Sequence, residues 1–562
     1  QKTLVNTSGD GNGSIALQGR RVFISGGSVI LNQNFGFQPS GDITVDASES
    51  LKLSGTSIDG KFISNLQTES LGFGKAADIN VFTPQVVIER GGRITSKAFG
   101  IGRGGNINVA SESTQLSGFS SFDPFITSAI VTTAASSSLG NAGNITLSTG
   151  YLLAKDGSVI TSLNLGNGSG GSVLINAKNT IELINSIEFL NSEPGSYIYS
   201  YLSSETANAG NAGNLTINTS KLLVGNKATI NTITRGFGSA GIVTINASEI
   251  EVNGSINSSA IKASLIGQQL FGAPAIPSGS PGEIIINSNK LKVANGGTLS
   301  VTNQGTSTAG GILTINANTI NMSNKASINA STVSGEGGNI WGFSSFLSLD
   351  DSRITATAGG SGNGGNIILN TSLLIGSNNS QIIANAFLGR GGKIQINAQG
   401  VFLSPNTQVS SKSQRGIDGT VDINANVFLA QTPVKSQTVQ ESPKIASVCP
   451  GISNTNAVAN RFVIKGRESA PISIDEPLYN QAFLETNSVA VKENESLAET
   501  QVPKIEEPTQ IVEAQGWVID AKGQITLVAT KSNDVTPNSV ADVSSCSSVT
   551  QIFPSIESVK NE

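Results

Sequence analysis

Histidine is absent from the 562 residues of this chain, and cysteine is limited to Cys449 and Cys546. Without histidine, a Ser-His-Asp or Cys-His catalytic site and a histidine-ligated metal are both excluded. Aromatic residues make up 5% of the chain, charged residues make up 13%, and the formal net charge is −5. No basic patch suggests nucleic acid as a partner. No apolar run reaches the length of about 18 residues that a membrane-spanning helix needs, so the sequence predicts no transmembrane segment.

The chain is instead rich in glycine, with 64 residues, and in Asn, Ser and Thr. Such a composition is also found in disordered low-complexity chains. Hydrophobic residues nevertheless reach 37%, and they alternate with polar residues. Because a disordered chain has no reason to alternate, the sequence predicts a folded β-protein.

A motif of a small residue, glycine, any residue and an aliphatic residue recurs along the chain. Examples are Ala142-Gly143-Asn144-Ile145 and Gly391-Gly392-Lys393-Ile394. The aliphatic anchors are spaced by 28, 36, 28, 38, 28, 42, 28, 41, 29, 27, 27, 27 and 27 residues. They lie at Ile15, Ile43, Ile79, Ile107, Ile145, Val173, Leu215, Val243, Ile284, Leu313, Ile340, Ile367, Ile394 and Val421. A fixed internal period of this kind is typical of a solenoid.

Each unit contains about three short alternating runs, as in 145–147, 151–154 and 158–161. Alternation at period two indicates strands with one inward face. The sequence therefore predicts an all-β chain dominated by a right-handed parallel β-helix with about 27–28 residues and three strands per coil. About 14 coils would occupy residues 1–429. A helical solenoid is disfavoured because the 3.6-residue pattern is missing, and an antiparallel sandwich would not need one period.

The residue two before the anchor is glycine in every unit except one, where it is Ala77. This glycine is interpreted as a turn residue that reaches positive φ. A phosphate cradle is the alternative, but no helix start follows these glycines. Three residues after the anchor, asparagine recurs in the later coils, where stacked amides could form a ladder. Asparagine as a plain turn residue is the alternative. The column comprises Asn176, Asn218, Asn246, Asn287, Asn316, Asn370, Asn397 and Asn424.

Four long units carry about 8 to 14 extra residues each, and the extra residues are expected after the second strand, on one side of the rod. One long unit contains Phe119, Phe122 and Phe125. Another contains Tyr197, Tyr199 and Tyr201, whose alternation predicts three rings on one face of a strand. Such a stripe could contact sugars or a protein partner. The alternative is that these loops pack down on the rod.

Composition changes near residue 430, where glycine becomes rare and proline and charge increase. Residues 430–562 are therefore predicted to form an irregular tail of linkers, short strands such as 461–467, and a hairpin over 516–529. Cys449 and Cys546 both lie in this tail. A disulfide between them would close a long loop and could contribute about 4 kcal/mol in the chain-entropy description. Two free thiols are the alternative.

The runs Gly-Asn-Ala-Gly-Asn-Ile-Thr-Leu (140–147) and Gly-Asn-Gly-Gly-Asn-Ile-Ile-Leu (362–369) resemble the filamentous-haemagglutinin-like large exoproteins of cyanobacteria. The tail segments Arg-Phe-Val-Ile-Lys-Gly-Arg (461–467) and Ile-Val-Glu-Ala-Gln-Gly-Trp-Val (511–518) resemble the C-terminal portion of the same proteins. The resemblance implies two-partner secretion through a dedicated outer-membrane transporter and an extracellular or cell-surface location. Relatives tether through closely spaced cysteine pairs, a spacing that Cys449 and Cys546 do not share.

Three functions remain open on the sequence. A non-catalytic adhesin or surface structural protein, which would mediate attachment or aggregation through cell-surface glycans or proteins, fits the repeats and the low charge, and needs no cofactor. A carbohydrate-active β-helix enzyme, such as a polysaccharide lyase or glycosidase, would need converging acidic residues. The repeats carry few, and Asp350-Asp351 is the one adjacent aspartate pair. A toxin-delivery stalk would need a toxic domain after the rod. We favour the adhesin.

Overall fold

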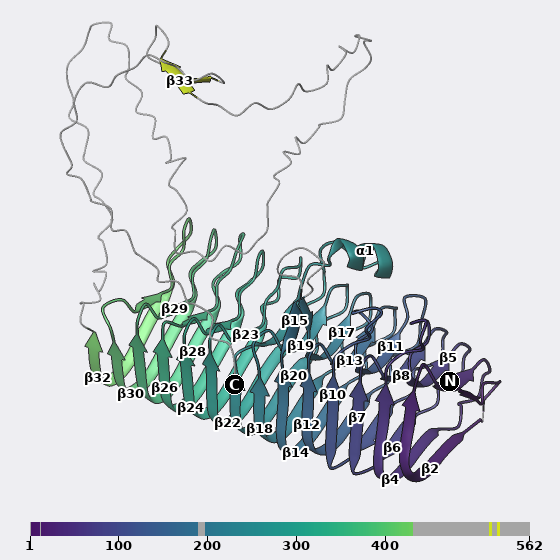
Figure 1. Ribbon diagram of the computed structural model, residues 1–562. Coiled ribbons are helices and arrows are strands. Elements are labelled where there is room, and N and C mark those ends of the chain that lie inside the picture. The colour runs from purple at the N-terminus through teal and green to yellow at the C-terminus, as the bar shows by residue number, and fades with distance from the viewer. Residues whose placement is uncertain (1, 12, 189–196, 431–515, 520–524, 529–562) are drawn as a thin grey trace, which may run out of the picture. The chain divides into compact units, whose positions relative to one another are not determined.

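The computed structural model describes residues 2–11, 13–188, 197–430, 516–519 and 525–528. The chain divides into two units, residues 1–444 and 445–562. In the first unit, strands stack in parallel into two long sheets, and the predicted parallel β-helix is confirmed (Figure 1). None of the helices in the described ranges is long and apolar enough to cross a membrane.

One sheet has 14 strands, each paired in parallel with the strand of the next coil. Its strands are β1 (Leu4–Asn6), β3 (Val29–Asn34), β5 (Asn65–Ser70), β8 (Arg93–Ala98), β11 (Ala129–Ala134), β13 (Val159–Asn164), β17 (Tyr201–Thr206), β19 (Thr229–Thr234), β21 (Ser255–Ala260), β23 (Thr298–Ser300), β25 (Ser327–Asn329), β27 (Arg353–Thr355), β29 (Gln381–Ile383) and β31 (Gln408–Ser410).

The other sheet has 16 strands. They are β2 (Ile15–Ser25), β4 (Ile43–Ser54), β6 (Ile79–Phe82), β7 (Gln85–Glu89), β9 (Ile107–Ala110), β10 (Ser113–Ser117), β12 (Ile145–Lys155), β14 (Val173–Ile184), β18 (Leu215–Val224), β20 (Ile242–Val252), β22 (Glu283–Ala294), β24 (Ile312–Ser323), β26 (Asn339–Asp350), β28 (Asn366–Ser377), β30 (Lys393–Leu403) and β32 (Thr420–Ala430).

The first two runs of most coils form one continuous strand of this 16-stranded sheet, not two. The register shifts inside these strands, for example between Thr149 and Tyr151 of β12, which marks a bulge where the strand changes direction. In two coils the runs are separate strands, β6 with β7 and β9 with β10. Pro84 lies in the first of these breaks, where its missing N–H cannot join the ladder.

The anchors predicted from the repeat pair with one another without a slip along the whole rod. Ile145, for example, is opposite Ile107 on one side and Val173 on the other. The first thirteen anchors are 0–6% exposed, and they belong to one continuous hydrophobic core. Parallel strands of neighbouring coils lie about 4.7–4.9 Å apart, so the 14 coils form a rod roughly 65 Å long.

The glycine two residues before each anchor has a different cause from the one predicted. None of these glycines has a positive φ, so the turn interpretation is wrong. A Cβ on Gly143 would instead lie 1.9 Å from the carbonyl oxygen of Gly105, and a Cβ on Gly171 would lie 1.9 Å from that of Gly143. Glycine is favoured at these positions because a Cβ would overlap the backbone of the neighbouring coil, although Ala77 fills the equivalent position before Ile79 with a buried methyl group.

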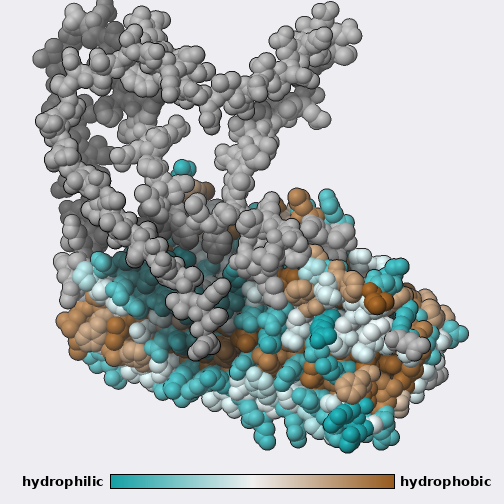
Figure 2. All heavy atoms as spheres, in the orientation of Figure 1, coloured by the Kyte–Doolittle hydropathy of each residue, from teal (hydrophilic) through white to brown (hydrophobic). Residues whose placement is uncertain are grey.

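The last described coil of the rod has apolar residues that are partly exposed. Val421, Val427, Phe428 and Leu429 are between 40% and 58% exposed, and hydrophobic residues gather at the β32 end of the rod in Figure 2. In the second unit, β33 (Gly516–Ile519) pairs antiparallel with β34 (Ile525–Val528), placing Trp517 opposite Leu527. This pairing matches the hairpin expected there. The strand predicted at 461–467 lies outside the described residues.

Candidate functional site

Three of the four long coils carry their extra residues as β-hairpins on one side of the rod. Their described residues are 55–64, 118–128, 185–188 and 197–200. The arms pair antiparallel at Thr56 with Ile63, at Phe119 with Thr127, and between β15 (Ser186–Glu188) and β16 (Tyr197–Tyr199). Each lies between the second run of its coil and the following strand of the 14-stranded sheet. We call these three segments the hairpin flank.

The fourth long coil differs from the expectation that all insertions lie on one side. Its extra residues, 261–282, follow β21 instead of preceding it, and they include the helix α1 (Leu265–Phe271). Ser264 caps this helix through its side chain, which accepts from the N–H of Gly267. The insertion therefore lies at the next corner of the rod, and the prediction was wrong for this coil.

A buried serine fixes each hairpin to the short coil before it. The Oγ atoms of Ser64, Ser128 and Ser200 accept hydrogen bonds of 3.0, 2.9 and 2.9 Å from the N–H groups of Gly27, Gly91 and Gly157. The same hydroxyls donate to the carbonyl oxygens of Ser54, Ser117 and Asn185 at 2.9, 2.7 and 2.7 Å. All three serines are 0% exposed. The rod therefore holds each hairpin base rigidly.

Replacing Ser128 with alanine is expected to loosen the second hairpin. The change leaves the N–H of Gly91 without its partner, which costs about 1–3 kcal/mol in a buried site. The carbonyl of Ser117 loses one of its two donors and keeps the N–H of Arg90 at 3.3 Å. Hydrogen exchange should accelerate across 118–128 and leave β28 and β30 unchanged. Ser137→Ala removes a hydroxyl on an exposed residue and is the control. Equal exchange in both variants would contradict this arrangement.

The glycines that donate to these serines lie in the turns of the short coils, and they also leave space for the hairpins. Gly27, Gly91 and Gly157 have φ of 77°, 86° and 83°, and a Cβ on each would lie 2.7 Å from an atom of the hairpin that follows. The first two hairpins also touch each other. A Cβ on Gly60 would lie 2.8 Å from Cγ of Phe122, so that ring rests on the first hairpin. In these three pairs of coils, the turn of the short coil is thus covered by the hairpin of the next coil.

The hairpin flank exposes large apolar side chains to solvent. Ile58 is 96% exposed, Phe125 is 76% exposed and Phe122 is 57% exposed. Exposed apolar side chains held on a rigid frame are typical of binding surfaces, because little side-chain and loop entropy is lost when a partner binds. Ile58 of the first hairpin and Phe122 and Phe125 of the second are therefore part of the candidate site, together with Tyr199 of the third, which is 43% exposed.

The tyrosines do not form the stripe that their alternation predicts. Tyr197 and Tyr199 belong to β16 of the third hairpin, whereas Tyr201 begins β17 in the 14-stranded sheet. Ser200 separates them, and its buried hydroxyl is the fastening described above. The prediction of one strand face was wrong because the chain passes from the hairpin to the rod at this residue. Tyr199 is 43% exposed and stays a candidate contact.

Tyr201 instead belongs to a charged cluster on the outer face of the 14-stranded sheet. Burial, reinforced by the Glu205 carboxylate, raises the pKa of its phenol well above the usual range. Glu205 forms an ion pair with Arg235. Arg93, further along the sheet, donates to the carbonyl oxygens of Thr127 at 3.0 Å and Phe125 at 3.2 Å. This arginine therefore holds the second hairpin against the sheet.

The asparagine column three residues after the anchor is present as a chain of hydrogen bonds. From Asn218 to Asn316, each Nδ2 donates to Oδ1 of the previous coil's asparagine at 2.8–2.9 Å. Phe343 interrupts the column. The chain resumes with bonds of 2.7 and 3.1 Å. The first run is Asn176, Asn218, Asn246, Asn287 and Asn316, and the second is Asn370, Asn397 and Asn424.

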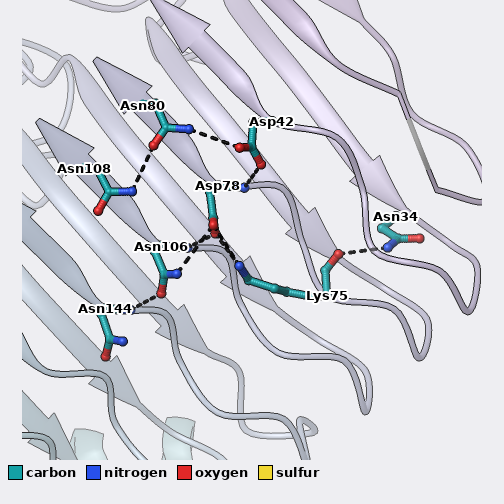
Figure 3. Close-up of polar contacts among 8 residues, drawn as sticks. All are labelled: Asn34, Asp42, Lys75, Asp78, Asn80, Asn106, Asn108 and Asn144. Atoms are coloured by element: carbon teal, nitrogen blue, oxygen red, sulfur yellow. Dashed lines mark hydrogen bonds and ion pairs between the residues drawn. The ribbon is translucent and has the colours of Figure 1, made fainter. Parts of the chain in front are cut away.

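The early coils use other columns that the sequence analysis missed (Figure 3). Oδ1 of Asp42 accepts from the N–H of Asp78 at 3.1 Å, Oδ1 of Asp78 accepts from that of Asn106 at 2.6 Å, and Oδ1 of Asn106 accepts from that of Asn144 at 3.0 Å. Lys75 pairs with Asp78 at 2.7 Å. The signal was the polar residue directly before each anchor, and its role is to join coils.

Carboxylates outside the hairpin flank also hold neighbouring coils together. Asp350 ends β26 and accepts hydrogen bonds from Ser377 at 2.8 Å and Asn378 at 2.6 Å in the next coil. Asp351 lies in the following turn with φ of 44°. Among the residues that the structure describes, no group of three or more His, Cys, Asp or Glu side chains could hold a metal ion. Cys449 and Cys546 lie outside the described residues, so the disulfide stays a prediction.

Comparison with known proteins gives one structural likeness. No protein-family model and no curated protein matches the chain. The HMW1 secretion domain from Haemophilus influenzae is similar to it with 15% sequence identity over 76% of this chain and 95% of that chain. The TM-score is 0.29, and at this value the likeness carries no argument about fold or function.

Proposed function

We propose that this chain is a secreted or cell-surface exoprotein that attaches cells to surfaces or to one another and performs no catalysis. The observation that carries the proposal is the hairpin flank: three hairpins on alternate coils, each fastened by a buried serine, with Ile58, Phe122 and Phe125 exposed to solvent. The rod positions these side chains, and they contact the partner.

Glycans or proteins of a cell surface are the partners that suit this flank. Aromatic side chains offer large rigid contact area at low entropic cost, and they are enriched at recognition sites. The resemblance of segments such as 140–147 and 362–369 to filamentous-haemagglutinin-like exoproteins supports export through an outer-membrane transporter of two-partner secretion. That partner, the extracellular location and the cyanobacterial affiliation are parts of the same proposal.

The test is a binding assay with the purified full chain on a glycan array and on whole cells. Ile58→Ser, Phe122→Ser and Phe125→Ser are combined in one flank variant. Phe237→Ser changes an equally accessible ring, 58% exposed, elsewhere on the rod and is the matched control. The wild type and the control should bind, and the flank variant should bind at least about tenfold more weakly, which corresponds to about 1.4 kcal/mol. Equal binding by all three would refute the role of the flank.

A carbohydrate-active β-helix enzyme is the competing function. It requires acidic side chains that converge on a bound sugar. A depolymerisation assay on acidic and neutral polysaccharides separates the two functions, because an attachment protein leaves chain length unchanged. Turnover that survives repurification would replace the attachment proposal with an enzymatic one.

A further inference from the structure

A second apolar surface lies at the corner of the rod that follows each strand of the 14-stranded sheet. Backbone hydrogen bonds join neighbouring coils at this corner, such as Phe73 N–H to Gly36 O at 3.1 Å and Leu139 N–H to Gly100 O at 3.2 Å. Seven large side chains point outward from the first four coils, with exposed fractions between 37% and 75%. We call this set the apolar stripe: Phe35, Phe37, Leu71, Phe73, Phe99, Ile101 and Leu139.

The stripe is ordered along the rod. The rings of Phe37 and Phe73 stack with centroids 4.7 Å apart and planes 10° from parallel, so their separation equals the spacing of neighbouring coils. None of the seven residues carries a charge, and the nearby Lys75 is neutralised by Asp78. The stripe therefore offers apolar area and a regular repeat, with exposed charged residues such as Asp10 and Arg103 beside it.

The same corner is covered further along the rod by the chain itself. Ala263 and Ala273 of the α1 insertion form a buried cluster with Ala207, and Leu165 packs against it. Ala207, Ala263 and Ala273 are small and buried and Leu165 is half-buried, whereas the residues of the bare stripe are large and exposed. Phe237, at the same corner, stays 58% exposed. At this corner the α1 insertion packs against the rod. Over the first four coils, no described segment of the chain packs on the apolar stripe in the same way.

The exposed area of the apolar stripe and its regular spacing indicate which partner binds there. With roughly 200 Å² for a large apolar side chain, the stripe exposes about 700 Å². That approaches the roughly 800 Å² per partner of a standard stable interface and exceeds the apolar patch of a typical monomer. A partner whose side chains recur at the same spacing of about 4.7–4.9 Å can interdigitate along the whole stripe. Another copy of this chain has that spacing, and two-fold pairing is self-complementary.

We propose that two copies of this chain pair side by side through the apolar stripe. Pairing removes the exposed rings from water and leaves both hairpin flanks accessible to their partners. The inference goes beyond the attachment function, since it concerns the purified chain alone and needs no cell-surface ligand. Two rods would associate side by side through this corner.

Sedimentation equilibrium of the full chain between about 1 and 100 μM tests the pairing. The stripe variant combines Phe37→Ser, Phe73→Ser, Ile101→Ser and Leu139→Ser. The control is the flank variant with Phe23→Ser added, which also replaces four exposed apolar side chains, because Phe23 is 63% exposed in β2 of the other sheet. The wild type and the control should form dimers with a micromolar dissociation constant, and the stripe variant should weaken pairing at least a hundredfold. Circular dichroism and unfolding midpoints check that every variant keeps the fold.

Two outcomes would overturn the pairing. A wild type that stays monomeric at 100 μM excludes it, as does a stripe variant that dimerises like the wild type. If a monomeric wild type binds phosphatidylcholine vesicles through the stripe, the partner of the stripe is a lipid surface. Loss of dimers in the stripe variant with glycan and cell binding retained would separate this inference from the attachment function.

Discussion

Gly171→Ala is expected to destabilise the rod by about 3 kcal/mol, at the upper end of the cost of overpacking. The new Cβ would lie 1.9 Å from the carbonyl oxygen of Gly143 and 2.5 Å from its carbonyl carbon. Both atoms are backbone, so no side-chain rotation can relieve the overlap. Because parallel hydrogen bonds join these two coils on both sides of the site, the coils must separate locally.

Urea unfolding followed by circular dichroism measures this effect. Gly19→Ala is the matched control, because it adds the same methyl group inside β2, where the nearest atom is 4.0 Å away. The control should change stability by less than about 1 kcal/mol, which is the usual cost or gain of exchanging glycine and alanine. A Gly171 variant as stable as the control would show that the coils are not in contact at this glycine column.

Ile145→Ala is expected to cost about 2–5 kcal/mol, because it removes a fully buried side chain from the middle of a continuous core. Val421→Ala lies in the same anchor column at the last coil, where the side chain is 42% exposed, and it should cost less than about 1 kcal/mol. In a solenoid, each coil is stabilised by its neighbours. Thermal unfolding of both variants measures the two losses of stability. Similar losses at Ile145 and Val421 would contradict the exposure of the apolar residues in the last coil.

The repeat could be predicted from the sequence because the same pattern of small, aliphatic and polar residues recurs in every coil. Ile145, Val173 and the other anchors pair in the predicted register, since the inward face of a strand must be apolar and a slip of one residue would expose it. The asparagine column was predictable for the same reason. Equivalent positions of a solenoid lie on top of one another, so a recurring amide meets a copy of itself.

The candidate site was less predictable because it depends on where the regular coil is interrupted. Alternation alone placed Tyr197, Tyr199 and Tyr201 on one strand, but the serine fastening at Ser200 divides them. The glycine column was recognised correctly and explained wrongly, because crowding between coils is not visible in a single coil. The apolar stripe escaped notice since its residues lie in turns, where no strand period marks them.

The most direct test of the account removes one hairpin and keeps the rod. Residues 118–128 would be replaced by the three-residue Arg-Gly-Gly turn that joins β7 to β8 in the preceding short coil. This chain should keep the unfolding midpoint of the wild type within a few degrees and should lose most of its binding to glycans or whole cells. Undiminished binding by the correctly folded graft would contradict the claim that the rod presents its hairpin flank to a partner.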